Sequence, residues 1–263
     1  EIIPTFCQRQ IYGYKAVAIS SLAIAGVGFL VWGHHMYTSG MSDQARWFFS
    51  LLTFIVAVPS AIKVFNWITT MYKGSIDVKP PFLYALAFIF LFIIGGTTGL
   101  LLGSVATNVQ VHDTSFVVAH FHYIIFGGMG FAFFAAIHYW LPKMYGRMYD
   151  FKIANIALVI NFIGFNLLYF PQFIIGVEGM PRRYFDYPAQ FQPMQVVSSI
   201  GGFILVAGLI LMVFNLVKGA KSGPVAPSNP WNGSTLEWTL PATPSLENFD
   251  EEPVIKENPY DYK

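Results

Sequence analysis

Six long apolar segments are the feature that most restricts what this chain can fold into. An α-helix needs roughly 20 such residues to cross the hydrocarbon core of a bilayer, which is about 30 Å thick. Charged residues make up 11% of the chain, against roughly 25% in soluble domains. The sequence therefore predicts an all-α integral membrane protein with six transmembrane helices, at about Ala16–Gly33, Ala45–Tyr72, Pro81–Ser104, Ser115–Leu141, Phe151–Ile174 and Met194–Val217.

Basic residues predict the orientation of these helices, because lysine and arginine accumulate on the cytoplasmic or matrix side of a membrane. The N-terminal segment, alternate connections and the segment after the last helix carry most of them, whereas the opposite loops carry Arg46, Arg182 and Arg183. We expect both termini on the cytoplasmic or matrix side. Three polar segments, at 34–35, 112–113 and 181–183, are then predicted to converge at the opposite face.

The composition changes near residue 218, where proline, serine, asparagine and glutamate become frequent. We expect residues 1–217 to form one transmembrane unit and residues 218–263 to form an extended peripheral tail. The single cysteine, Cys7, excludes a disulfide framework, a dinuclear thiolate copper centre and a CxxCH haem attachment within this chain. The N-terminus has neither an initiator methionine nor a signal peptide, so we expect a processed chain or part of a longer one.

Histidine is concentrated in two places, the pair His34-His35 and the segment HDTSFVVAHFHY at residues 112–123. Imidazole is costly to hold in hydrocarbon, and metal coordination is the commonest compensation. His34-His35 follows an apolar run, where a distorted helix end could turn both rings toward one ion of copper, iron or zinc.

His120 and His122 cannot share one metal if they lie on a helix, because residues two apart point about 200° apart around its axis. Each is predicted to reach a different cofactor on opposite flanks of the helix. Two haems with axial histidine satisfy this arrangement. The alternative is a neutral imidazole that packs on a neighbouring helix and donates to a carbonyl oxygen.

Four motifs in order carry a resemblance to a known family: VWGHHMYTSGM at 31–41, PSAIKVFNW at 59–67, HDTSFVVAHFHY at 112–123 and GMPRRYFDYP at 179–188. Together they resemble subunit I of the cytochrome c oxidases, in the haem–copper oxidase superfamily. The similarity continues into the tail, through NPW at 229–231 and LEWTLP at 236–241. It implies the last six helices of a twelve-helix bundle.

The resemblance implies a role for each of the clustered histidines. His34 and His35 correspond to two ligands of the copper called CuB. His120 corresponds to the axial ligand of the high-spin, oxygen-binding haem, and His122 to an axial ligand of the low-spin haem. Both haems are expected to be a-type.

At the outer face, the resemblance implies that His112 and Asp113 hold magnesium and that Arg182 and Arg183 pair with haem propionates. Guanidinium groups bind carboxylates bidentately, which suits this assignment. Lipid headgroups or Asp186 are the alternative partners of the two arginines.

Lys63 lies in the middle of an apolar run, and an ionisable group within a membrane is a functional hypothesis by default. The resemblance places Lys63 on the proton path called K, with Ser60 one turn earlier on the same face. Thr98 is a further candidate for this route. A lysine that reaches the interface or pairs locally is the structural alternative.

The implied activity is reduction of O2 to water at a haem–CuB centre, with proton uptake and proton pumping, in a bacterial or mitochondrial inner membrane. The first implied partner is the N-terminal half of subunit I, in the same or a separate chain, and without it this chain is expected to be inactive. The other implied partners are subunit II with a thiolate copper centre, subunit III, cytochrome c or an associated haem c donor, and lipid. Nucleic acid is not expected. A quinol oxidase or nitric oxide reductase of the same superfamily stays open. So does a non-catalytic metal-binding membrane scaffold.

Overall fold

The computed structural model describes residues 1–249, 252–254 and 262, and the rest of the predicted tail lies outside these residues. Within them, six helical segments are long and apolar enough to cross a membrane, which confirms the predicted spans: Tyr14–Met36, Asp43–Met71, Pro80–Gly103, Ser115–Tyr145, Phe151–Val177 and Ala189–Ser222. The elements in chain order are α1 (Ile2–Cys7), α2 (Tyr14–Phe29), η1 (Trp32–Met36), α3 (Asp43–Met71), α4 (Pro80–Gly103), α5 (Val105–Val111), α6 (Ser115–His122), η2 (Tyr123–Gly130), α7 (Phe131–Tyr145), α8 (Phe151–Val177), η3 (Ala189–Phe191), α9 (Gln192–Ser222) and η4 (Leu236–Thr239).

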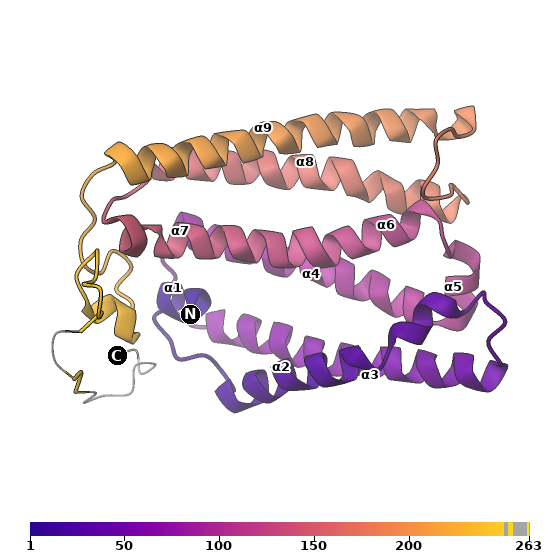
Figure 1. Ribbon diagram of the computed structural model, residues 1–263, viewed down its shortest axis with the longest axis horizontal. Coiled ribbons are helices and arrows are strands. Elements are labelled where there is room, and N and C mark those ends of the chain that lie inside the picture. Colours follow the sequence, from indigo (N-terminus) through magenta and orange to yellow (C-terminus); the bar gives the residue numbers. More distant parts are fainter. Residues whose placement is uncertain (250–251, 255–261, 263) are drawn as a thin grey trace.

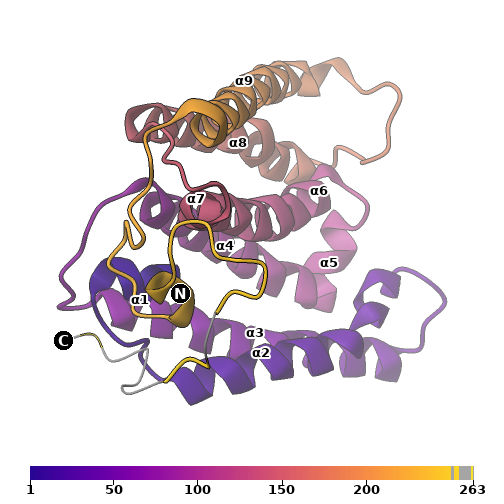
Figure 2. The same ribbon diagram turned by 60° about the vertical axis from the view of Figure 1, so that its left-hand side comes forward.

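The long helices lie side by side in three layers (Figure 1). One layer is the α8–α9 pair, the middle layer holds α4 and the continuous α6–η2–α7 span, and the third holds α2 and α3 (Figures 1 and 2). The 3₁₀ helix η1, α5 and the loop before α9 lie at one end of the bundle, which we call the histidine end. The N-terminus and the C-terminal region lie at the other end, which we call the tail end.

Glycines set how closely the layers approach. A Cβ atom at Gly176 of α8 would lie 2.1 Å from the backbone nitrogen of Phe116 in α6. At Gly201 of α9, a Cβ atom would lie 2.3 Å from the backbone nitrogen of Leu168 in α8. Small residues at such positions let transmembrane helices pack backbone to backbone. The contact at Gly176 fixes the start of α6, the helix that carries His120 and His122.

The C-terminal region folds back over the tail end of the bundle. Helix α9 continues to Ser222, so the tail begins later than the predicted residue 218. The indole of Trp231 donates to the backbone oxygen of Tyr139 at 2.7 Å, and that of Trp238 donates to its hydroxyl at 2.8 Å. The ammonium of buried Lys143 donates to three tail carbonyl oxygens, those of Ser228, Leu240 and Pro241. The described part of the tail is therefore docked on the end of the bundle, and its peripheral location stays a prediction.

His138 is the histidine outside the two clusters, and it lies buried in the interior. Its Nδ1 atom is 2.7 Å from the backbone oxygen of Phe134, and its ring stacks on Tyr84 at a centroid distance of 4.6 Å. A carbonyl oxygen can only accept, so Nδ1 carries the proton. The packing is that of a structural histidine.

Candidate haem and copper site

The two adjacent histidines lie on the 3₁₀ helix η1, which follows α2 directly. Their Nε2 atoms are 3.0 Å apart, and their rings meet at an interplanar angle of 70°. Gly33 permits this placement, because a Cβ atom there would lie 2.4 Å from the ring of Phe49 in α3. The short helix η1 thus brings the Nε2 atoms of His34 and His35 together, and their sharing of one ion stays a prediction.

Hydrogen bonds fix the tautomer of His34. Its Nδ1 atom is 3.1 Å from the hydroxyl oxygen of Thr53, and that hydroxyl donates to the backbone oxygen of Phe49 at 2.7 Å. The hydroxyl proton is therefore in use, so Nδ1 of His34 donates to the hydroxyl oxygen and Nε2 is left with a lone pair. Metal-ligating histidines are commonly oriented in this way by a partner on the second ring nitrogen.

The spacing of His34 and His35 fits a shared metal ion. Two nitrogens that are each about 2.0–2.1 Å from an ion lie about 3 Å apart when the angle between the bonds is near 90°. The observed separation of 3.0 Å matches this value. The donor set, two imidazoles, suits copper.

His120 faces α4. Its Nδ1 atom is 3.1 Å from the backbone oxygen of Gly95 and 3.1 Å from the hydroxyl of Thr98. The carbonyl oxygen only accepts, so Nδ1 carries the proton and Nε2 keeps its lone pair. The ring lies against Gly99, where a Cβ atom would be 3.0 Å from its Cε1 atom. His120 thus meets the donor requirement for an axial haem ligand.

The side chain of His120 also lies near the histidine pair on η1. In the fold, His120 lies close enough to His34 and to His35 that positive charges on these rings would repel each other. The structure therefore brings together three imidazoles from two segments that are far apart in the sequence. Thr98, a candidate for the proton route, instead contacts the ring of His120.

His122 faces α8. Its Nδ1 atom is 2.8 Å from the backbone oxygen of Val118 on its own helix, and its ring stacks on Tyr169 with centroids 4.0 Å apart. Because His120 contacts α4 instead, the prediction that the two rings leave the helix on opposite flanks is confirmed. The proton on Nδ1 again leaves a lone pair on Nε2, which fits a second haem.

A π-helical segment, η2, begins at Tyr123, directly after the second of these histidines. Such segments are rare and occur often at functional sites. It packs closely on α4, because a Cβ atom at Gly127 would lie 2.9 Å from the Cβ of Leu91. Sequence reasoning missed this feature, and the three glycines within four residues, at 127, 128 and 130, were the available signal.

The loop between α5 and α6 meets the loop before α9 at the histidine end. The Arg182 guanidinium forms an ion pair with Asp113, and the Arg182 backbone nitrogen donates to the Asp113 backbone oxygen at 2.9 Å. His35 interacts electrostatically with Arg182 and with His112. The predicted convergence of the three polar segments is confirmed. The direct pairing of Arg182 with Asp113 was not anticipated, because the two residues were assigned to different cofactors.

The same region offers donors for the outer cofactors. Nε2 of His112 is 3.8 Å from a carboxylate oxygen of Asp113, and Mg²⁺ is commonly held by one or two carboxylates together with waters. No group of three or more potential metal ligands occurs within the described part of the chain, so this pair fits part of such a site. Arg182 Nε is buried with no partner among the described groups, which fits an acceptor such as a haem propionate. Arg183 is exposed beside it.

Lys63 and Ser60 lie one turn apart on α3, the long helix that follows the histidine pair in the sequence. The Lys63 ammonium is 5.5 Å from the centroid of the Trp67 ring, and the Ser60 hydroxyl donates to the backbone oxygen of Val56. Polar side chains recur on this helix toward the tail end, where Asn66 and Thr70 are buried. This polar line along α3 is compatible with a proton route.

Comparison with known proteins identifies the family. Residues 1–204 match the family described as cytochrome c and quinol oxidase polypeptide I. Cytochrome c oxidase subunit 1 is 42% identical in Thermostichus vulcanus and 44% identical in Synechocystis sp., in each case over all of this chain and 48% of the relative. The same subunit of Cereibacter sphaeroides is 42% identical over 96% of this chain and 45% of its own length.

A solved structure supports the same conclusion. A haem–copper terminal oxidase dimer, determined by cryo-EM, matches 82% of this chain and 44% of its own with a TM-score of 0.71 at 25% identity. The chain spans about half the length of the relatives that it matches. On the family match over residues 1–204 and the curated relatives, the chain belongs to the family of cytochrome c and quinol oxidase polypeptide I.

Proposed function

We propose that this chain supplies half of the catalytic subunit of a cytochrome c oxidase, which reduces O2 to water and takes up protons. The observation that carries the proposal is the set of imidazoles from η1 and α6: His34 and His35 with Nε2 atoms 3.0 Å apart, and His120 with its proton held on Nδ1. Relatives named cytochrome c oxidase subunit 1 support it. When bound, an a-type haem and copper would supply the site for oxygen and for the electrons that reduce it.

In this proposal, each histidine acts through its orientation. Thr53 orients His34, and the carbonyl of Gly95 with Thr98 orients His120. Both imidazoles therefore present an unprotonated Nε2 to the reaction centre without rearranging. The ring of His122 lies on the α8 side, with its centroid 4.0 Å from that of Tyr169, and its Nε2 would hold the second, low-spin haem.

Charged side chains at the histidine end hold anions and cations near this centre. Arg182 and Arg183 would bind haem propionates, while His112 and Asp113 would hold magnesium. The Asp113–Arg182 ion pair would join these two functions, because it restrains the guanidinium that would bind a propionate. Lys63 and Ser60 would carry protons toward the centre. Proton compensation of each electron is necessary in a site of low dielectric constant.

The half-length coverage and the name of the relatives, subunit 1, support the proposed partners. The N-terminal half of subunit I would provide the third copper histidine and the second low-spin haem ligand. Subunit II would supply a thiolate copper centre that receives electrons from cytochrome c or an associated haem c donor, with subunit III and lipid completing the complex. Both termini would lie on the cytoplasmic or matrix side.

A quinol oxidase is the second candidate, because the matched family covers both donors. The test is steady-state oxygen consumption by the assembled complex with reduced cytochrome c or with a quinol as donor. Turnover with cytochrome c supports the proposal, and turnover with quinol alone supports the second candidate. A pyridine haemochrome spectrum without haem would contradict both and would support a non-catalytic scaffold.

The ligand assignment needs a variant of its own. His120→Ala is expected to remove the high-spin haem signal from the optical spectrum while the low-spin signal persists. His138→Ala is a matched control, because His138 lies on the same membrane span and contacts none of the candidate ligands. An unchanged high-spin signal in His120→Ala would contradict the assignment.

A further inference from the structure

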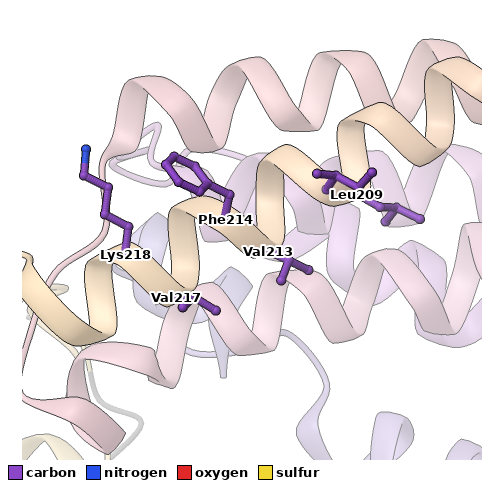
Figure 3. Close-up of a pocket in the computed structure, with 6 residues that line it drawn as sticks. Leu209, Val213, Phe214, Val217 and Lys218 are labelled. Carbon is purple, nitrogen blue, oxygen red and sulfur yellow. The ribbon is translucent and has the colours of Figure 1, made fainter.

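A shallow apolar groove runs along the outward face of α9 in its last turns. It has a volume of about 570 Å³ and is lined by Leu209, Ile210, Val213, Phe214, Val217 and Lys218 (Figure 3). Side chains four residues apart form ridges along a helix, and a groove lies between neighbouring ridges. One ridge here contains Val213 and Val217, and the other contains Phe214 and Lys218.

Each ridge ends on a lysine at the tail end of the bundle. Continuing by four residues, the first ridge reaches Lys221, and the second ends at Lys218; both are exposed. The Lys218 ammonium lies 6.0 Å from the centroid of the Phe214 ring, above the end of the groove. Asp150, the acidic residue that begins α8 at this end, accepts from the backbone nitrogen of Ile153 and caps its own helix. The apolar groove therefore ends beside two lysine ammonium groups.

The residue types on α9 distinguish a lipid from another protein helix as the occupant. The side that meets α8 and the adjoining loop carries small residues: a Cβ atom at Gly201 would lie 2.3 Å from Leu168, and one at Gly219 would lie 2.7 Å from Tyr149. Interfaces between transmembrane helices are enriched in such residues. The groove is lined instead by branched and aromatic side chains, which are typical of a surface that faces acyl chains.

We propose that this groove binds one acyl chain of an anionic phospholipid, whose phosphate lies between Lys218 and Lys221. From Leu209 to Val217 the helix rises about 12 Å, which is close to the depth of one leaflet of a hydrocarbon core about 30 Å thick. The groove is therefore about as long as an acyl chain within one leaflet, and the two lysines lie where the headgroup of that lipid would be. Basic sites at the ends of transmembrane helices on the cytoplasmic or matrix side commonly bind anionic headgroups.

The experiment uses the assembled oxidase complex in nanodiscs that contain a phospholipid with a photoactivatable acyl chain. Phosphatidylglycerol is the anionic probe and phosphatidylcholine, with the same acyl chains, is the zwitterionic one. Crosslinked peptides are quantified by mass spectrometry. We expect labelling within residues 209–217, about 25-fold stronger for phosphatidylglycerol, because each of the two lysines contributes about a fivefold preference for anionic lipid near a membrane surface.

Two sets of variants separate the headgroup from the groove. Lys218→Gln with Lys221→Gln is expected to abolish the preference for phosphatidylglycerol and to leave labelling by phosphatidylcholine, whereas Lys73→Gln, a control at the end of α3, preserves it. Val213→Trp fills the groove and is expected to lower labelling by both probes. Absence of labelling at 209–217, as when another protein helix covers the groove, or equal labelling by the two lipids in the unmodified complex, would overturn the proposal.

Discussion

His34 and His35 are neighbours in the sequence, and the 3₁₀ helix η1 brings their Nε2 atoms to 3.0 Å. The lone pair on His34 Nε2 is available because the proton of this imidazole is on Nδ1, which donates a hydrogen bond to the hydroxyl oxygen of Thr53. A hydroxyl on α3 therefore orients a candidate ligand on η1.

Thr53→Val should weaken copper binding. The change removes the partner of His34 Nδ1 but keeps the shape of the side chain, and loss of such an outer contact typically costs 10–100-fold in metal affinity. Copper retained by the assembled complex during titration with a chelator measures the effect. Thr97→Val is the control, because its exposed hydroxyl bonds to the backbone oxygen of Ile93 on its own helix. Equal retention in both variants would show that Thr53 does not orient the ligand.

Gly99→Ala should disturb the haem that His120 is proposed to bind. The added Cβ atom would lie 3.0 Å from Cε1 of the imidazole, so the ring must shift. Gly96→Ala makes the same change on the same helix, and nothing lies within 4 Å of its added Cβ atom. The optical spectrum of the high-spin haem is expected to change in Gly99→Ala and to stay unchanged in Gly96→Ala. The reverse pattern would contradict the orientation of His120.

Lys63→Met should slow proton delivery to the reaction centre. Removal of a positioned proton-transfer group typically costs about 10²-fold or more in rate. The measurement is the rate of high-spin haem reduction by stopped-flow spectroscopy. Lys73→Met, at the end of the same helix, removes a charge without touching the polar line along α3 and is expected to react at the original rate. A normal rate in Lys63→Met would remove this residue from the proton route.

Cys7 should stay unreactive in the folded protein at neutral pH. Burial raises the pKa of its thiol to about 11, although Arg9 opposes this effect. The thiolate is the reactive form, so its fraction is small below that pH and rises only as pH approaches 11. Maleimide labelling at pH 7 is expected after unfolding in detergent and not before. Rapid labelling of the native complex would indicate an accessible thiolate.

Local rules predicted much of the site. The flanks taken by His120 and His122 follow from the 100° step of an α-helix, and the structure shows one ring against α4 and the other against α8. The shared direction of His34 and His35 was also expected at a helix end. What those rules missed is the π-helical segment after His122, because a short wider turn within a continuous span leaves its apolar pattern almost unchanged.

Contacts between distant segments were not predictable in the same way. Asp113 and Arg182 were both identified as polar groups at one face, but their ion pair depends on how the loop before α9 meets the end of α5. The docking of the tail through Lys143 and Trp238 likewise depends on a surface built by several helices. No spacing within either segment indicates its partner.

The sequence by itself determined the six membrane spans, the placement of the histidines and the directions of their side chains. These depend on hydrophobicity and helical periodicity, which act between residues a few positions apart. The tertiary structure decided which groups orient the imidazoles, since Gly95 and Thr98 lie on α4 and His120 lies on α6. It also decided which ions pair and where the tail docks, because these contacts exist only after helices with complementary surfaces have packed.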